Sequence, residues 1–377
     1  MRKLILGGNS LITGSGSLNY LENIKEKNVF ILTGSKSMME NGVIGRMEAI
    51  LQKNDCNIKV YTGIKKNPDE DTILQAMKDM NDFCPQVLIA IGGGSPMDAA
   101  KIMTIFYEYP QLNFEDLRLG NIPQSRNMLN FIAIPTTSGT ASEVTRASVV
   151  TFRKDNIKIG LKSDAFVPDV AILDPDLTMT MPDKVVAETG MDAMTHAVEA
   201  YCNEAIEDFT EVLARGAVGG LYKYLPISYH EKTLLSREKV HNYQCMAGYA
   251  FANAGLGMVH GIAHSIGGKF DEAHGLINAV ALPYVLEYNS QNPVVKEKLT
   301  ILAKEIGVEC FVSAIKELNA KLNIPTSFSH IGIEKEIFYK DLAEITLNAL
   351  QGSTRSNPIK MTQESMQALL VKIYEGK

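Results

Sequence analysis

The stretch "VLIAIGGGSPMDAAKIM", residues 87–103, decides the fold of this chain. It begins with a short apolar run rich in β-branched residues, which is typical of a strand buried on both faces. Three glycines, Gly92 to Gly94, end the run, and apolar residues at helical spacing follow. A strand, a glycine turn and a helix in this order form one unit of a doubly wound parallel sheet.

The same alternation extends to both sides of this stretch. Strands are predicted at residues 28–34, 57–63, 85–94 and 130–137, and a helix at 69–83. Short apolar runs separated by helices indicate a parallel sheet that is covered on both faces. After about residue 181 strand-like runs cease, and long helices are predicted at 185–201, 208–225 and 237–255. We therefore predict an α/β domain, residues 1–181, followed by an all-α domain, residues 182–377.

The composition excludes several classes of protein. Of the 377 residues, 45% are hydrophobic and 21% are charged, which is ordinary for a soluble globular chain. The formal net charge is −6 and no basic run stands out, so we expect no nucleic-acid partner, because phosphate contacts need clustered Lys and Arg. No window approaches the ~20 apolar residues of a membrane span. The five cysteines lie far apart without a CxxC pair, which indicates reduced thiols and a cytoplasmic protein.

The glycine turn suits an anion. Gly93 and Gly94 have no Cβ, so a phosphate could approach the backbone closely, and the start of the following helix offers unpaired N–H groups. The alternative is a helix start that binds nothing, in which Ser95 at the N-cap, Pro96 at N1 and Asp98 at N3 form a capping box. The glycines alone do not decide between these interpretations, because the turn is not the GxGxxG fingerprint.

A second loop favours a nucleotide ligand. The stretch "IPTTSGTASEV", residues 134–144, follows another predicted strand and is rich in hydroxyl groups. Loops at the carboxyl ends of parallel strands are where such sheets bind ligands. A polar loop without a ligand is the alternative, but two such loops after neighbouring strands favour a nucleotide.

Histidines are concentrated in the helical half. The stretch "HGIAHSIGGKFDEAH", residues 260–274, holds three of the seven histidines of the chain. Earlier in the sequence Asp192 and His196 stand four residues apart, which in a helix puts both side chains on one face. A carboxylate with imidazoles and no thiolate suits Fe²⁺, Zn²⁺ or Mn²⁺, with an open position for a substrate oxygen. Spacing alone would pair His260 with His264, as in HxxxH zinc sites.

These blocks resemble the signature blocks of one family. The stretches "GGGSPMD", "IPTTSGTASEVT", "TGMDAMTHAVEAY" and "HGIAHSIGGKFDEAHGLINAVALPYV" are similar, in order and spacing, to those of the iron-containing, group III alcohol dehydrogenases. The similarity extends from about residue 16 to "SNPIKMTQES" near the C-terminus. It implies a dinucleotide-binding α/β domain, an α-helical metal domain and an active site in the cleft between them.

The resemblance also implies roles for particular residues. The implied ligands of a metal ion, iron or alternatively zinc, are Asp192, His196, His260 and His274. His264 would then be a catalytic side chain that faces the nicotinamide and the substrate. The implied cofactor contacts are Gly93, Gly94, Ser95, Asp98, Thr136, Thr137, Thr140 and Lys158. The chain departs from many relatives at Ala273, where they have a proline, and in "ALQGSTRSNP", which lacks an acidic residue common there.

The turn after residues 28–33 bears on the choice of cofactor. NAD-binding sheets commonly place Asp or Glu there for the ribose 2′-OH, and many relatives have Asp at the position of Gly34. Here Gly34, Ser35 and Lys36 offer no carboxylate and one cation, so we predict that NADP(H) is preferred over NAD(H). The alternative is an ordinary helix-start turn in an enzyme that uses NAD.

The predicted function is reversible hydride transfer between a nicotinamide and a small alcohol or aldehyde whose oxygen a metal ion holds. Alternatives are a glycerol-dehydrogenase-like enzyme, a dehydroquinate-synthase-like lyase and a nucleotide-binding regulatory protein without catalysis. The lyase would need a basic cluster, which the helical half lacks near the ligands. Arg146 could favour an acidic aldehyde, or could be solvated or salt-bridged. The resemblance further implies a homodimer in which "KLILGG", residues 3–8, pairs as a strand outside its own domain.

Overall fold

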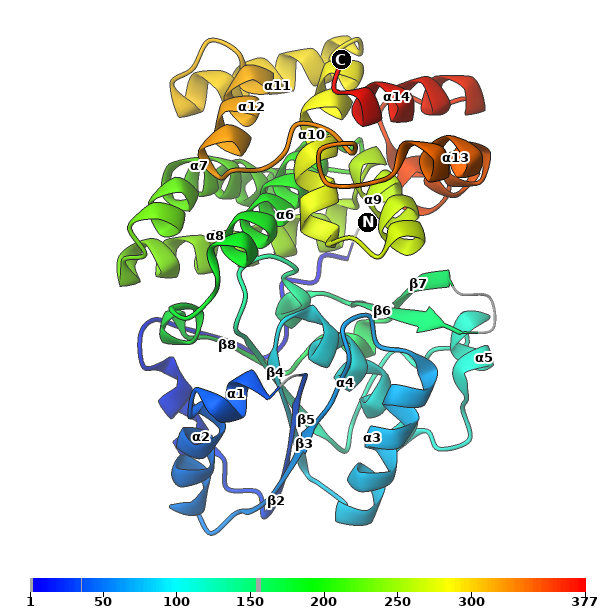
Figure 1. Cartoon of the computed structure of the whole chain (residues 1–377). Helices are drawn as coiled ribbons and strands as arrows, with labels where there is room; N and C mark the ends of the chain where they lie inside the picture. Colours follow the sequence, from blue (N-terminus) through cyan, green and yellow to red (C-terminus); the bar gives the residue numbers. More distant parts are fainter. Residues whose placement is uncertain (1–2, 35, 154–156) are drawn as a thin grey trace. The chain divides into compact units, whose positions relative to one another are not determined.

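The structure is a computed structural model of the chain and describes residues 3–34, 36–153 and 157–377. It divides into two compact units, which we describe separately (Figure 1). The first unit consists of two segments, the chain up to Thr137 and Ala141–Thr180. The second unit consists of Ser138–Thr140 and Met181–Lys377.

A six-stranded parallel sheet is the centre of the described part of the first unit (Figure 1). Its strands are β1 (Ser10–Thr13), β2 (Asn28–Thr33), β3 (Asn57–Thr62), β4 (Val87–Gly92), β5 (Asn130–Pro135) and β8 (Val170–Leu173). They lie in the order β1-β8-β5-β4-β2-β3, and each pair of neighbours is parallel. The carboxyl ends of β2, β4 and β5 therefore meet at one edge of the sheet, where such sheets bind ligands.

Helices cover both faces of this sheet. They are α1 (Ser37–Glu40), α2 (Val43–Gln52), α3 (Glu70–Phe83), α4 (Gly94–Glu108) and α5 (Phe114–Arg118), with 3-10 helices at Ser17–Asn23, Ser142–Val144, Asp164–Phe166 and Pro175–Thr178. Phe30 and Leu88 point to the face that α3 and α4 cover, whereas Val29 and Ile89 point to the face that α2 covers. Successive strand residues alternate between faces, and both faces are buried, so the strands read as continuous apolar runs.

A separate hairpin follows the hydroxyl-rich loop. Strands β6 (Ala147–Phe152) and β7 (Ile157–Lys162) pair antiparallel, with Thr151 opposite Lys158. The sequence analysis did not predict this hairpin.

The second unit is helical. Its helices are α6 (Asp183–Cys202), α7 (Asp208–His230), α8 (Leu234–Ala254), α9 (Met258–Phe270), α10 (His274–Asn289), α11 (Pro293–Ile306), α12 (Phe311–Lys321), α13 (Lys335–Ala349) and α14 (Gln363–Glu375), with a 3-10 helix at Gly352–Ser356. One apolar core connects them, with buried side chains from α6 through α14. Every residue of α6 from Gly190 to Cys202 is buried, so the polar side chains of this stretch lie inside the unit.

The predicted fold class, an α/β sheet domain followed by an all-α domain, is confirmed. Strands β2 to β5 and helices α3, α6, α7 and α8 occur where they were predicted, within a few residues. The segment 3–8, predicted as a strand, lies outside every strand of the described chain, and β1 begins only at Ser10.

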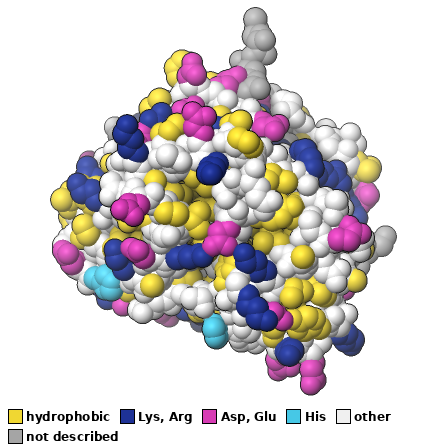
Figure 2. All heavy atoms as spheres, turned by 90° about the horizontal axis from the view of Figure 1, so that it is seen from above, with side chains coloured by type: hydrophobic (Ala, Val, Ile, Leu, Met, Phe, Trp, Pro, Cys, Tyr) yellow, Lys and Arg dark blue, Asp and Glu magenta, His cyan; other side chains and the backbone are white. Residues whose placement is uncertain are grey.

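The surface carries charges of both signs. Acidic and basic side chains are interspersed with apolar ones on the face that Figure 2 shows. In the second unit, for example, Glu287 of α10 pairs with Lys316 of α12 and Lys372 of α14. None of the described helices combines the length and the apolar character needed to cross a bilayer.

Candidate active site

The turns after β2, β4 and β5 lie against one another in the first unit. The ring of Pro96 packs between two of them, because a Cβ added to Gly34 would lie 3.5 Å from its Cγ and one added to Gly92 would lie 2.8 Å from it. A Cβ added to Gly93 would lie 3.4 Å from the hydroxyl oxygen of Thr137. Three of the predicted cofactor contacts, Gly34, Gly93 and Thr137, therefore lie at the same edge of the sheet. Because Gly34 and Gly93 have no Cβ, a ligand could approach their main chain closely.

The start of α4 differs from the predicted capping box. The helix begins at Gly94 with Gly93 at the N-cap, and no side chain caps it. Ser95 lies inside the first turn, and the carboxylate of Asp98 accepts a hydrogen bond from the Ser142 hydroxyl at 2.8 Å. The capping box is therefore wrong, because the carboxylate it requires is bonded elsewhere. A helix start with two glycines and no side-chain cap leaves its N–H groups to an outside acceptor.

Lys101 connects α4 to the segment that follows the hydroxyl-rich loop. Its ammonium group donates to Ser142 Oγ at 2.8 Å, to Thr145 Oγ1 at 3.1 Å and to the carbonyl oxygen of Ala147 at 2.7 Å. The side chain is fully buried, and this burial lowers the pKa of Lys101 to about 8, against the opposing effect of nearby carboxylates. The sequence analysis missed this residue, although a lysine among the apolar residues of a predicted helix was a visible signal.

The other predicted cofactor contacts are more scattered. Lys36 is exposed at the N-cap of α1, and Ser35 lies outside the described residues. Thr136 is buried and its N–H bonds the carbonyl of Gly92 at 2.8 Å. Lys158 is half-buried on β7, and Thr140 belongs to the second unit.

The loop tip 138–140 packs within the second unit. A Cβ added to Gly139 would lie 2.6 Å from Cβ of Thr189 on α6, so the backbone approaches this helix closely. The hydroxyl of Ser138 bonds His241 Nδ1 at 2.9 Å, with both residues buried. His241 is thus a structural histidine that fixes the loop tip.

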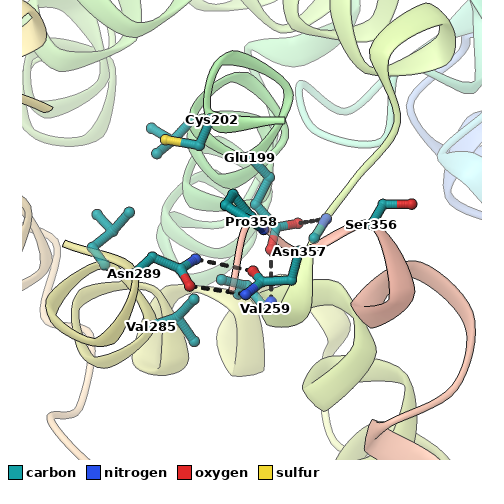
Figure 3. Close-up of a pocket in the computed structure, with 11 residues that line it drawn as sticks. Glu199, Cys202, Val259, Val285, Asn289, Ser356, Asn357 and Pro358 are labelled. Carbon is teal, nitrogen blue, oxygen red and sulfur yellow. Dashed lines mark hydrogen bonds between the residues drawn. The ribbon is translucent and has the colours of Figure 1, made fainter. Parts of the chain in front are cut away.

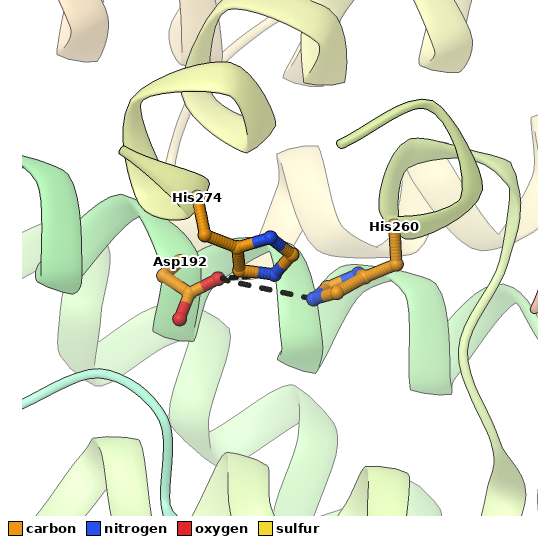
Figure 4. Close-up of side chains that lie close together, drawn as sticks. All are labelled: Asp192, His260 and His274. Carbon is orange, nitrogen blue, oxygen red and sulfur yellow. Dashed lines mark ion pairs between the residues drawn. The ribbon is translucent and has the colours of Figure 1, made fainter. Parts of the chain in front are cut away.

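Three side chains from three helices converge in the second unit (Figure 4). Asp192 lies on α6, His260 on α9, and His274 is the first residue of α10. Their ligand atoms all lie within 4.8 Å of one another. Asp192 Oδ1 is 3.8 Å from His260 Nε2 and 3.7 Å from His274 Nε2. A carboxylate and two imidazoles that share one point can bind a transition-metal ion.

The two remaining histidines of interest each stack on one histidine of this group. His196 Nε2 lies 4.0 Å from Asp192 Oδ1, and its buried ring stacks on His260 with centroids 4.6 Å apart. The ring of His264 is exposed and stacks on His274 with centroids 5.1 Å apart. His196 therefore lies beside Asp192 and His260 but outside the group of three whose ligand atoms all lie within 4.8 Å of one another, and His264 is exposed next to His274.

The donor set fits a cation. Two ligands bound to one ion at ~2.1 Å lie at most ~4.2 Å apart, and the three distances from Asp192 Oδ1 are below that limit. Burial lowers the pKa of His196 and lowers the pKa of His260 well below its ordinary value. Burial would raise the pKa of Asp192, but the surrounding imidazoles and a side-chain hydrogen bond outweigh it, and the net pKa is lowered. A metal ion binds a carboxylate in its ionised form and imidazoles in their deprotonated form.

Glu199, which the sequence analysis missed, holds one of these histidines. One of its carboxylate oxygens accepts from His260 Nδ1 at 2.6 Å and from the N–H of Gly257 at 3.0 Å, and the other accepts from the N–H of Val259 at 2.6 Å. Burial raises the pKa of Glu199 to about 7. Figure 3 shows this carboxylate beside a small cavity, next to the mutually bonded amides of Asn289 and Asn357. The signal was present, because Asp192, His196 and Glu199 follow one face of a helix.

Comparison with known proteins now identifies the family. The sequence model described as iron-containing alcohol dehydrogenase matches residues 9–175, and that of the Fe-containing alcohol dehydrogenase family, C-terminal, matches residues 186–374. The chain belongs to the iron-containing alcohol dehydrogenase family. It is 39% identical to the NADPH-dependent butanol dehydrogenase of Clostridium saccharobutylicum, over 96% of each chain. It is 35% identical to an aldehyde-alcohol dehydrogenase of Streptococcus pneumoniae, over 96% of this chain but 44% of that protein.

The fold agrees with solved members of this family. The iron-containing alcohol dehydrogenase of Thermococcus thioreducens superposes with a TM-score of 0.92 and 32% identity, over 99% of this chain and 100% of that one. As a member of this family, the protein is a metal-dependent oxidoreductase of alcohols and aldehydes.

The structure bears on two further residues of the sequence analysis, Ala273, which departs from the pattern of many relatives, and Arg146, for which alternative roles were open. Ala273 is the N-cap residue of α10 with a φ of −65°, which is the value that a proline ring imposes, so the loop keeps its path without proline. Arg146 pairs with Asp164 at 3.4 Å, and Asp164 also pairs with Lys3 at 2.6 Å. Of the alternatives considered for Arg146, the structure therefore contains the salt bridge.

Proposed function

We propose that the protein reduces small aldehydes, reversibly, with NADPH, and that Asp192, His196, His260 and His274 hold an Fe²⁺ ion, or alternatively Zn²⁺. The observation that carries this proposal is the buried group of donor atoms in the second unit. Nε2 of each of the three histidines lies 3.7–4.0 Å from a single oxygen of Asp192. The identity of a relative as an NADPH-dependent butanol dehydrogenase supports both the substrate class and the cofactor.

Different side chains of the site have different roles in such a reaction. When bound, the ion and the nicotinamide supply Lewis-acid polarisation of the substrate oxygen and the hydride. Glu199 accepts from His260 Nδ1, which fixes the ring so that Nε2 faces the other donors. His264, at the exposed side of the group, can take up or release a proton at a ring nitrogen.

Four ligand substitutions test the assignment. Asp192→Ala, His196→Ala, His260→Ala and His274→Ala should each lose metal and aldehyde-dependent NADPH oxidation together, because each removes a donor atom. His264→Ala should keep the metal but lose activity or change its pH dependence. His230→Ala, an exposed histidine bonded to the carbonyl of Lys321, is the control and should change neither. A ligand variant that keeps stoichiometric metal at wild-type affinity is wrongly assigned, and a metal-free His264→Ala protein would reinstate the HxxxH pair.

The proposed preference for NADPH rests on the turn after β2. Gly34 and the exposed Lys36 present no carboxylate to repel a 2′-phosphate, and Lys36 can donate to it. Gly34→Asp should shift kcat/KM toward NADH. A Cβ there would lie 3.2 Å from the carbonyl oxygen of Ile64, so the variant also carries a steric cost, which Gly34→Ala measures alone. A wild-type preference for NADH would reject this part of the proposal.

A homodimer and a cytoplasmic location complete the proposal. The five cysteines form no disulfide among the described residues, and Cys84 and Cys310 are exposed, which suits a reducing compartment. Cell fractionation tests the location.

A further inference from the structure

Asn278 lies on α10, one helical turn after His274, and its side chain is fully buried. Its amide nitrogen Nδ2 is 2.7 Å from Asp192 Oδ1, 3.1 Å from His274 Nε2 and 3.3 Å from His260 Nε2. We propose that Asn278 is a positioning residue of the metal site, whose amide group holds the three ligand atoms together before an ion binds. The inference rests on the metal site of the proposed function and adds to it a residue that binds no metal itself.

The orientation of the amide follows from its partners. The atom facing Asp192 must be the nitrogen, because the amide oxygen at 2.7 Å from an ionised carboxylate would put two acceptors in contact. The amide oxygen is also buried and has no hydrogen-bond partner among the described residues. All the hydrogen bonding of Asn278 that the structure describes is thus directed at atoms of the candidate ligands.

A buried asparagine with a purely structural role is available for comparison nearby. Asn319 of α12 is also buried, and its Nδ2 donates at 2.7 Å to the carbonyl oxygen of Ala279 on α10. Its amide oxygen likewise has no partner in the described structure. The two residues differ in what the amide nitrogen holds, because Asn319 contacts the main chain and Asn278 contacts the ligand atoms.

Electrostatics explains why the site needs such a residue. Because the amide nitrogen of Asn278 can only donate, the carboxylate oxygen and the two ring nitrogens that it contacts act as acceptors, and converging acceptors repel one another through their lone pairs. The amide N–H groups carry partial positive charge and offset this repulsion when no cation is present. A carboxylate oxygen has two lone pairs, so Asp192 can keep its bond to Asn278 and still bind a cation, whereas each ring nitrogen has one lone pair and exchanges the amide for the cation. Residues that hold metal ligands in this way typically change metal affinity by 10–100-fold when they are removed.

The test compares Asn278→Ala with Asn319→Ala and the wild type. The dissociation constant for Zn²⁺, measured by chelator competition, should rise by about 10–100-fold in Asn278→Ala and stay at the wild-type value in Asn319→Ala. The visible absorption of bound Co²⁺ should change in Asn278→Ala only, because it reports ligand geometry. The melting temperature of the metal-free proteins shows that both variants are folded.

The outcomes are distinct. Wild-type Zn²⁺ affinity together with a wild-type Co²⁺ spectrum in Asn278→Ala would overturn the inference and leave the proposed function intact. An equal loss of affinity in Asn319→Ala would overturn it too, since the effect would then come from the packing of α10. A wild-type protein that binds neither ion would reject the metal site itself, and the inference with it.

Discussion

The carboxylate of Glu199 shows how much a single buried residue contributes to the site. It accepts from His260 Nδ1 and from two main-chain N–H groups at the start of α9, so it fixes the histidine and the helix that carries it. Glu199→Gln keeps the volume but replaces one acceptor oxygen with a donor. We expect the metal affinity to fall by about 10–100-fold while the protein remains folded.

Chelator competition with Zn²⁺ measures this change. Glu287→Gln serves as the control, because it removes a carboxylate from the surface of α10, where it pairs with Lys316 and Lys372. Equal affinities in Glu199→Gln and the wild type would show that His260 needs no carboxylate to hold its ring.

Lys101 gives the first unit a pH dependence of stability. Its pKa is about 8 in the folded protein against 10.5 ordinarily, because burial disfavours the charged form. Below pH 8 the group is protonated in both states, and above pH 10.5 it is neutral in both. Between these values the unfolded chain binds the proton more tightly, so the contribution of Lys101 to the free energy of unfolding rises with pH. The rise is at most about 3 kcal/mol.

Lys101→Met removes this dependence. Urea unfolding of both proteins between pH 7.5 and 10.5 should show the wild type gaining stability relative to the variant as pH rises. A constant difference would mean that Lys101 keeps an ordinary pKa in the fold.

At the scale of elements, the pattern of apolar residues predicted whether a segment is a strand or a helix. It did not predict which side chains of a helix face the core. Buried strands β2, β4 and β5 stand out in the sequence as continuous apolar runs, and the long helices α6 to α8 stand out because their apolar residues recur at helical spacing. The same periodicity placed His260 and His264 on one face of α9. In the structure His260 is buried and His264 is exposed, because tertiary packing sets which edge of that face points inward.

The parts that were missed depend on contacts between distant segments. Asp98 is 44 residues from Ser142, and Glu199 is 61 residues from His260, so no local pattern connects either pair. In the hairpin β6–β7, strand β6 alternates buried and half-buried residues, so it lacks the continuous apolar run that marks β4 in the sequence. The sequence could therefore supply the residue types of the site, but not the bonds that hold them.

The junction between α9 and α10 offers a test of backbone conformation. Ala273 already has the φ of a proline and is the N-cap residue of α10. Ala273→Pro should raise the free energy of unfolding by about 0.4–1 kcal/mol, because it restricts the unfolded chain without straining the folded one. Ala273→Gly should lower it for the opposite reason.

Thermal unfolding of the metal-free proteins gives the order of the three melting temperatures. A lower melting temperature for Ala273→Pro than for the wild type would mean that Glu272 cannot adopt the extended backbone that a following proline requires.

At the scale of the whole molecule, two units of different architecture supply different chemistry. The first provides glycine turns at one edge of a parallel sheet, and the second provides the buried donor group of Asp192. The short segment Ser138–Thr140 belongs to the second unit although the chain on both sides of it belongs to the first. Hydropathy could not predict this assignment, because it rests on the close approach of Gly139 to Thr189 and on the bond from Ser138 to His241.

The last prediction concerns assembly and rests on the N-terminal segment 3–8. Lys3 pairs with Asp164 at 2.6 Å and Asn9 donates to the carbonyl of Asp169 at 2.7 Å, so both ends are held by the first unit. Between them Leu6 is 49% exposed, and the segment belongs to no strand of the described chain. An apolar segment held in this way can pair with its copy in a second chain, which is the self-complementary contact of a two-fold dimer. Light scattering should then give twice the 41.4 kDa of one chain.

A proline in this segment tests the pairing directly. Leu6→Pro removes an N–H group and should raise the fraction of monomer, whereas Leu6→Ala removes a similar apolar surface but keeps the N–H group and should remain dimeric. Both are measured by light scattering over a dilution series, because dissociation depends on concentration. A wild-type monomer at micromolar concentration would reject the dimer. A Leu6→Pro protein as dimeric as the wild type would assign the interface to another surface, since strand pairing cannot tolerate a lost donor at its centre without weakening.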